Sequence, residues 1–244
     1  MAHRPYIREV ENSGTAVVFI HGIMGSPDHF LSLIPLTPCD YSIYNVLLRG
    51  HGGTVSDFCR SRLRQWRAQV CELVDSLCNR YENIIIVGHS MGTLFAIEQA
   101  LIHPDKVKKL FLLATPLKTK CSPSTLFSGL KLFLGKLDPK SVNSANSSYS
   151  LAPEKNKLKF LGFIPRYLEL FGEISRVKKR LGGVTASALS FHSGLDELVS
   201  LKSVELLKRN PSFDCRILEK SHHSYYEQGD LNILCNAYSS FVID

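Results

Sequence analysis

Long apolar runs alternate along this sequence with stretches whose apolar residues recur at helical spacing. The apolar runs occupy residues 15–22, 41–50, 83–90, 109–116, 184–194 and 213–221. Most of these runs are continuous, which is typical of strands buried on both faces of a parallel sheet. Two stripes between them predict helices, one of Leu63, Trp66, Val70, Leu73 and Leu77, the other of Leu94, Ile97, Leu101 and Ile102. The pattern predicts an α/β sheet with its reactive loops at the carboxyl ends of the strands.

The alternation is interrupted once, between residues 117 and 183, where no run reads as a central strand. This segment contains the helix-like KLKFLGFIPRYLELFGEI, in which Pro165 is expected to start or bend a helix. One helical face is predicted to carry Phe160, Ile164, Tyr167, Leu168 and Phe171. We therefore predict a core formed by residues 1–116 and 184–244, with residues 117–183 inserted into it.

Charge is distributed unevenly. The 244 residues carry a net charge of +7, yet residues 118–183 contain 13 Lys and Arg against 4 Asp and Glu, a net charge of +9. The remainder of the chain has a net charge of −2. Basicity is thus a property of one segment, and without a recognisable nucleic-acid-binding motif it does not indicate a nucleic-acid-binding protein.

Cysteine usage and hydropathy bear on the cellular compartment. The seven cysteines are odd in number and form no CxxC pair, so they indicate neither a disulfide framework nor a zinc site. The opening MAHRPYIREV lacks the apolar run of a secretory signal, and no uncharged apolar stretch approaches 18 residues. These features predict a soluble cytoplasmic protein with reduced thiols.

The clearest chemical motif is IIIVGHSMGTLF, residues 84–95, in which Gly88 and Gly92 flank Ser90. The motif lies where a predicted strand passes into a predicted helix, the setting of a nucleophile elbow. Glycines allow the strand and helix to approach closely, and the turn lifts the Ser90 hydroxyl above the sheet. The amide of Met91 would point from the helix N-terminus toward an anion formed there. Ser90 is therefore a candidate nucleophile, the alternative being a glycine-rich packing turn.

A second motif, HGIMGS at residues 21–26, follows the first predicted strand. Acyl transfer needs a second amide donor for the oxyanion, and a turn kept open by Gly22 can supply the N–H of Ile23. We expect His21 to be a structural hydrogen-bonding residue.

A serine nucleophile also needs a base and an orienting carboxylate. Asp196 and the adjoining Glu197 follow one late strand, and His222 and His223 follow the next, in the chain order Ser, acid, His. Neighbouring side chains diverge in a tight loop, so only one carboxylate can reach the imidazole, and we expect Glu197 to be solvated. Composition does not choose between the two histidines.

Taken together, FIHGIMGS, LLRGHGGT, VGHSMGT, KLFLLATP, SGLDELVS and KSHHS resemble the α/β-hydrolase superfamily, and within it the monoacylglycerol lipase and carboxylesterase branch. The resemblance implies a mostly parallel sheet flanked by helices, with residues 117–183 as a helical cap between the sixth and seventh strands. It maps the nucleophile to Ser90, the acid to Asp196 and the oxyanion amides to Ile23 and Met91. Its S-G-H pattern makes His223 the base, with His222 where glycine is usual, and Thr93 replaces a further glycine.

The resemblance implies a serine hydrolase of carboxylic esters that needs no metal and no organic cofactor. The expected substrate is a small acyl ester, with an apolar pocket suggested by the aromatic and leucine residues of the cap. The basic charge of the cap is typical of a solvated helical face, and it also allows weak contact with an anionic membrane or an acyl carrier. The alternatives are an acyl-thioesterase, an aminopeptidase-like amidase and a catalytically inactive ligand-binding protein of this fold. An aspartate-dependent dehalogenase or epoxide hydrolase is disfavoured because serine occupies the elbow.

Overall fold

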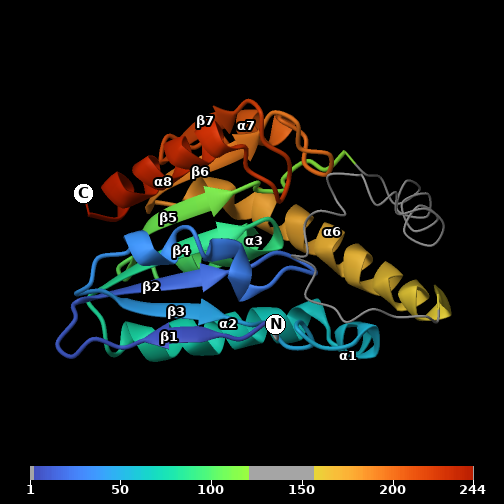
Figure 1. Ribbon diagram of the computed structural model, residues 1–244, viewed down its shortest axis with the longest axis horizontal. Helices are drawn as coiled ribbons and strands as arrows, with labels where there is room; N and C mark the ends of the chain where they lie inside the picture. The colour runs from blue at the N-terminus through green and yellow to red at the C-terminus, as the bar shows by residue number, and fades with distance from the viewer. Residues whose placement is uncertain (1–2, 121–156, 244) are drawn as a thin grey trace.

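A computed structural model describes residues 3–120 and 157–243, which form a sheet flanked by helices on both faces (Figure 1). The strands are β1 (Tyr6–Arg8), β2 (Thr15–Ile20), β3 (Ser42–Val46), β4 (Asn83–His89), β5 (Val107–Leu113), β6 (Ser187–Ser193) and β7 (Phe213–Leu218). Their order across the sheet is β1-β3-β2-β4-β5-β6-β7, and every described pairing is parallel except that of β1 with β3. The predicted α/β class is confirmed.

Helices connect the parallel strands. The α-helices are α1 (Val55–Arg60), α2 (Leu63–Cys78), α3 (Met91–Ile102), α6 (Phe163–Arg180), α7 (Lys202–Leu207) and α8 (Gln228–Ile243). Short 3-10 helices are η1 (Pro27–Phe30), η2 (Ile34–Leu36), η3 (Lys157–Gly162) and η4 (Leu181–Gly183). Helix α1 begins with a capping box, in which the Thr54 hydroxyl accepts from the Asp57 amide and the Asp57 carboxylate accepts from the Thr54 amide.

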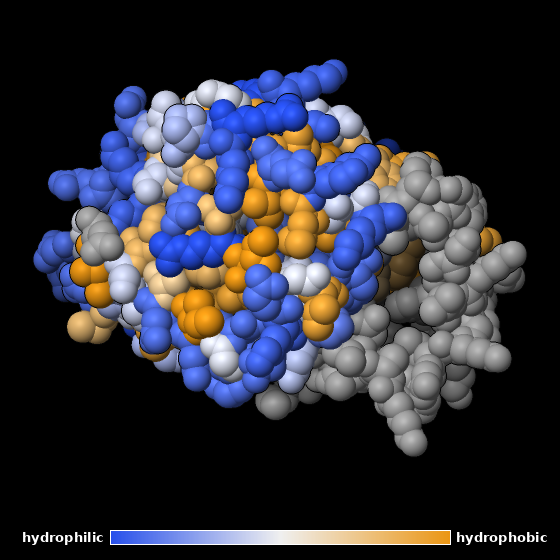
Figure 2. Space-filling model, turned by 90° about the horizontal axis from the view of Figure 1, so that it is seen from above, coloured by the Kyte–Doolittle hydropathy of each residue, from blue (hydrophilic) through white to orange (hydrophobic). Residues whose placement is uncertain are grey.

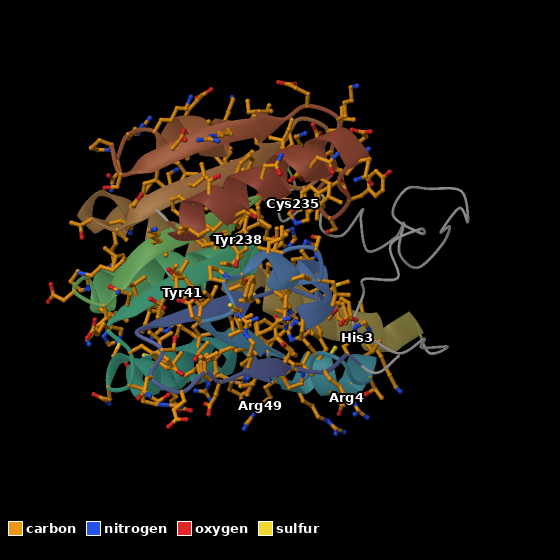
Figure 3. The ribbon with its side chains drawn as sticks, turned by 60° about the vertical axis from the view of Figure 1, so that its left-hand side comes forward. His3, Arg4, Tyr41, Arg49, Cys235 and Tyr238 are labelled. Carbon is orange, nitrogen blue, oxygen red and sulfur yellow. The ribbon has the colours of Figure 1, made fainter. Side chains whose placement is uncertain are left out.

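The core lies on both sides of the sheet because successive strand residues point to opposite faces. On β2, Val18 and its alternate neighbours pack into a cluster with α2, α3 and α6. Val17 and Phe19 point the other way, into a second cluster with α8. Tyr238 of α8 lies between that helix and the sheet (Figure 3), where its hydroxyl hydrogen-bonds to the Thr37 hydroxyl at 2.6 Å. Burial on both faces explains the continuous apolar runs of the sequence.

The segment predicted as an insertion lies between β5 and β6, the fifth and sixth described strands, whereas the resemblance placed it between the sixth and seventh. Residues 121–156, which belong to the predicted insertion, lie outside the described residues. The helix predicted around Pro165 is α6, with the proline in its first turn.

The predicted apolar face of α6 coincides only in part with the buried one. Tyr167 and Phe171 pack partly against the core, and the side chain of Phe160 lies outside the described residues. Leu168 is 52% exposed, whereas Phe163, Leu170, Ile174 and Val177 are buried against the core. Two charged residues, Arg166 and Glu173, interrupt the apolar spacing of the buried face, so hydropathy does not reveal that face. Both residues are buried. The structure compensates their charges with ion pairs.

The ion pairs of Arg166 and Glu173 lie within α6, and one further pair connects the helix to the core. Arg176 on α6 pairs with Glu173, and at 2.8 Å with the buried carboxylate of Glu98 on α3. Near the start of α6, Arg166 pairs with Glu169 at 3.0 Å and donates to the Ser61 carbonyl. The C-terminal part of the inserted segment is thereby attached to the helix that follows Ser90.

All six described cysteines are free thiols: Cys39, Cys59, Cys71, Cys78, Cys215 and Cys235. Cys39 is exposed, and the other five are partly buried. Burial raises the pKa of those five thiols, that of Cys215 to about 11. They are therefore mostly protonated near neutral pH.

The face carrying β7, α7 and α8 mixes apolar with charged residues (Figure 2). Its exposed apolar side chains include Ile217 on β7 and Ile233 on α8, which are 42% and 55% exposed. Within residues 3–120 and 157–243, no helix combines the length and apolar character needed to cross a bilayer.

Five histidines are built into the fold with lowered pKa values. Burial lowers the pKa of His29, His51 and His192 to about 4, and that of His21 and His89 well below its ordinary value. Unfolding returns each imidazole to a pKa near 6.5. Between about pH 6.5 and pH 4 the unfolded chain therefore binds more protons than the folded chain.

We accordingly expect the free energy of unfolding to fall as pH falls through this range. Each such histidine contributes up to about 1.4 kcal/mol per pH unit. Urea denaturation at pH 7.5, 6.0 and 5.0 measures this slope. The variant His29→Phe keeps a ring but removes one titrating group, so its slope should be shallower. Equal urea midpoints at pH 7.5 and pH 5.0 would contradict the prediction.

Candidate active site

Ser90 occupies a strained turn between β4 and α3. Its backbone has φ 50° and ψ −120°, values that cost a residue with a side chain about 1–3 kcal/mol. Hydrogen bonds hold the turn: the Ser90 amide donates to the Leu113 carbonyl at 2.8 Å, and the amide and hydroxyl of Thr93 donate to the Ser90 carbonyl. Thr93, where the family resemblance would place a glycine, thus contributes to the turn.

The flanking glycines are required by close backbone contacts. A Cβ added to Gly92 would lie 2.0 Å from the carbonyl oxygen of Ile20, and one added to Gly88 would lie 2.8 Å from the backbone of Thr93. A Cβ on Gly22 would lie 3.0 Å from the Cβ of Ser90. No side chain fits at Gly88 or Gly92 without a shift of backbone, which is why the elbow needs glycine there.

The structure brings Ser90, His223 and Asp196 together. The Ser90 hydroxyl lies 3.1 Å from His223 Nε2, and His223 Nδ1 lies 2.8 Å from Asp196 Oδ2. This network assigns the Nδ1 proton of His223 to the carboxylate and leaves Nε2 free to accept from the serine. All three residues are buried, with exposed fractions of 7%, 6% and 2% in the order serine, histidine, aspartate.

Asp196 is held ready as a charged carboxylate. Its Oδ1 atom accepts from the amides of Leu198 and Val199, both at 2.7 Å. Burial alone would raise the pKa of this carboxyl group, but the hydrogen bond and charge of His223, aided by the two amides, lower the pKa on balance. A charged Asp196 can orient the imidazole and stabilise its protonated form.

In each of the two adjacent pairs, Asp196–Glu197 and His222–His223 (the two doublets), the other candidate side chain lies elsewhere. His222 does not face Ser90; its Nδ1 atom lies 3.6 Å from the Glu197 carboxylate, and its amide donates to the Tyr225 carbonyl. Glu197, expected to be solvated, is partly exposed but also accepts from the backbone amide of His223 at 3.3 Å.

The loop after β2 places the second expected amide donor. The N–H groups of Ile23 and Met91 have no hydrogen-bond acceptor among residues 3–120 and 157–243. His21 holds this loop, because its Nε2 accepts from the Leu48 amide and its Nδ1 bonds to the Gly22 carbonyl. On the other side of Ile23, the Met24 amide donates to His51 Nε2 at 3.2 Å. Structural histidines thus fix the backbone around Ile23, as the sequence predicted for His21.

No cluster of three His, Cys, Asp or Glu residues is arranged to hold a metal ion in the part of the chain that the structure describes. The chemistry available at this site is that of a serine, an imidazole, a carboxylate and backbone amides. Such a set can transfer an acyl group through a covalent serine intermediate.

The sequence profile of the alpha/beta hydrolase family matches residues 17–231, and the chain belongs to this family. It is 25% identical, over 226 residues, to a thermostable monoacylglycerol lipase from Bacillus sp. (strain H-257), an alignment that covers 88% of this chain and 84% of the relative. The family expected from the sequence motifs is confirmed.

Two solved structures share the fold. One comes from a study of the metagenome-derived lipolytic enzymes LipS and LipT, with a TM-score of 0.76, 19% identity and coverage of 100% of this chain and 98% of that one. The other is a monoacylglycerol lipase from Paleococcus ferrophilus, with a TM-score of 0.70, 16% identity and coverage of 98% of both chains. At these identities the likeness shows the fold.

Two contacts with the backbone of His223 were not predicted from the sequence. One joins His89, the residue before Ser90, to the backbone of His223, and the other joins Glu197 to the same backbone. The only signal for either was adjacency to a predicted site residue. Adjacency does not say where a side chain points, so these contacts needed the structure.

Proposed function

We propose that this protein is a serine hydrolase of carboxylic esters. The observation that carries the proposal is the buried hydrogen-bonded chain from Asp196 through His223 to a serine on a strained strand–helix turn. Membership of the alpha/beta hydrolase family and similarity to a monoacylglycerol lipase support ester hydrolysis in particular. An inactive ligand-binding protein of this fold would have no need of these hydrogen bonds between Asp196, His223 and Ser90.

In the proposed mechanism, the Ser90 oxygen attacks the ester carbonyl carbon while His223 Nε2 takes the hydroxyl proton. The carbonyl oxygen becomes an oxyanion that accepts hydrogen bonds from the amides of Ile23 and Met91. As the tetrahedral intermediate collapses, His223 gives the proton to the leaving alcohol and an acyl-serine remains. Water, deprotonated by His223, then attacks the acyl-serine; the acid leaves and the proton returns to Ser90.

The proposed substrate is a small ester with an apolar acyl chain. The similarity to a monoacylglycerol lipase favours this class, as do the aromatic and leucine residues of the segment 117–183, which we propose as a cap over the site. Ser90, His223 and Asp196 could also cleave thioesters, or amides in the manner of an aminopeptidase-like amidase, so these are the alternatives.

The basic charge of the cap leads us to propose weak contact with anionic lipid or an acidic acyl carrier. The free thiols lead us to propose a cytoplasmic location.

Substrate class is tested with matched series of p-nitrophenyl esters, acyl thioesters and anilides of graded chain length, alongside labelling by a fluorophosphonate probe. We expect labelling of Ser90 and the highest kcat/KM on esters. Labelling with higher kcat/KM on thioesters would replace the ester proposal with the thioesterase alternative. A native protein that is neither labelled nor active would favour the ligand-binding alternative.

The two histidines give a matched pair of variants. His223→Ala removes the only imidazole within hydrogen-bonding distance of the Ser90 hydroxyl in the described chain, so kcat should fall by on the order of 10⁴-fold or more. His222→Ala removes a partly exposed ring that faces Glu197, and kcat should change by less than about tenfold. Initial rates on one ester measure both. Activity that survives the first change and is lost with the second would assign the base to His222.

A further inference from the structure

The imidazole that precedes the serine contacts the same histidine as the serine does. His89 is 3% exposed and lies between two other rings, with centroid distances of 3.8 Å to His29 and 5.0 Å to His223. Its Nε2 atom lies 2.9 Å from the backbone carbonyl oxygen of His223. Since a carbonyl only accepts, Nε2 of His89 carries the proton and donates it. Burial lowers the pKa of His89, which favours this neutral donor form.

Two pairs of adjacent residues therefore hold His223 at four atoms. From the elbow, Ser90 contacts the ring at Nε2 and His89 contacts the backbone oxygen. From the loop after β6, Asp196 contacts the ring at Nδ1 and Glu197 accepts from the backbone amide at 3.3 Å. Each pair supplies one contact to the imidazole and one to the peptide backbone that carries it.

His223 needs such support because it lies on the irregular loop between β7 and α8, and no helix or strand fixes its backbone. A displacement of about 1 Å in a reacting group can cost about 100-fold in rate. We propose that His89 and Glu197 are positioning residues that hold the backbone of His223, so that its ring stays between Ser90 and Asp196. This inference rests on the proposed function of Ser90 and His223.

The test for His89 compares two replacements. His89→Phe keeps a ring in the stack but removes the donor, and kcat should fall by about 10- to 100-fold while KM changes by less than about twofold. His89→Gln returns an N–H group at a similar reach, and it should recover most of the loss. The control His29→Phe alters the other ring of the stack, which has no hydrogen bond to His223, and should keep kcat within about twofold. Wild-type kcat in His89→Phe, or a loss that His89→Gln does not recover, would overturn the role of His89.

Glu197 gives an independent test at a partly exposed position, where replacement carries little risk to folding. Glu197→Ala should lower kcat by about 3- to 10-fold, and Glu197→Gln, whose amide oxygen still accepts from the backbone, should recover it. Equal kcat in the two variants would remove Glu197 from the proposal.

A double-mutant cycle separates positioning from general damage. In a His223→Ala background no imidazole remains to be positioned, so His89→Phe should lower the residual rate by less than about twofold. A loss as large as in the wild-type background would show that His89 acts elsewhere, and would overturn the inference. The Ser90→Ala variant separates failure of the proposed function from failure of the positioning role. If Ser90→Ala stays active, the proposed function is wrong. If Ser90→Ala is inactive and His89→Phe is fully active, only the positioning role of His89 is wrong.

Discussion

Replacement of Ser90 by alanine is expected to lower kcat on an ester substrate by on the order of 10⁴- to 10⁶-fold, because the proposed nucleophile is lost. The residual rate would come from the proposed oxyanion amides and from substrate binding. Binding of an unreactive ester analogue should be retained. Single-turnover kinetics and fluorophosphonate labelling measure the loss.

A matched control is Ser26→Ala in the loop that carries Ile23. The Ser26 hydroxyl is buried and has no hydrogen-bond partner among the described residues, so its removal should leave kcat within about twofold. If Ser90→Ala kept a tenth of the wild-type rate, the reaction would have to use another nucleophile.

Replacement of Gly92 by alanine is expected to be the most destabilising change at the elbow. The new Cβ would lie 2.0 Å from the carbonyl oxygen of Ile20 and 2.7 Å from its carbon, both backbone atoms of the central strand β2. The strand and α3 would have to separate, at a cost of about 3 kcal/mol or more in the free energy of unfolding. Urea denaturation, or loss of soluble protein, measures the effect.

The control for Gly92→Ala is Gly172→Ala in the middle of α6. A Cβ at Gly172 meets no atom within 4 Å, so this variant should gain up to about 1 kcal/mol from the higher helix propensity of alanine. If the two variants had equal stability, the glycine at position 92 would not be required by the contact with β2.

The central strands could be predicted because burial on both faces produces continuous apolar runs such as Ile84–Val87. The edge strand β1 could not, since Tyr6 and Ile7 are exposed and three residues carry no periodic signal. Its position depends on tertiary contacts, among them the Arg8 guanidinium, which donates to the Tyr41 carbonyl at 2.9 Å.

The buried face of α6 was predicted only in part, and for a different reason. A hydropathy stripe treats Arg166 and Glu173 as surface residues, but both are buried by their ion pairs and hydrogen bonds. Both charges are compensated by partners three residues away on α6, Glu169 for Arg166 and Arg176 for Glu173. Whether these pairs face the core depends on the packing of α6 against α3, where Arg176 also pairs with Glu98. Apolar periodicity alone does not contain that information.

At the site, chain order was enough to select Ser90 and the two doublets, but not the member of each doublet that faces the serine. That choice depends on the direction of the loops. The His222 amide donates to the Tyr225 carbonyl, and within the segment that this bond spans the ring of His223 faces Ser90. Only the family resemblance, through its S-G-H pattern, selected His223 from the sequence.

The partly buried thiols have a consequence for chemical probing. Alkylating reagents react with thiolates, and burial keeps Cys59, Cys71, Cys78, Cys215 and Cys235 protonated near neutral pH. A serine-directed carbamate or phosphonate that carries a fluorescent reporter should therefore meet little competition from these five side chains. If the probe labels Ser90 as proposed, its fluorescence on the purified protein reports the reactive serine with little contribution from these five thiols.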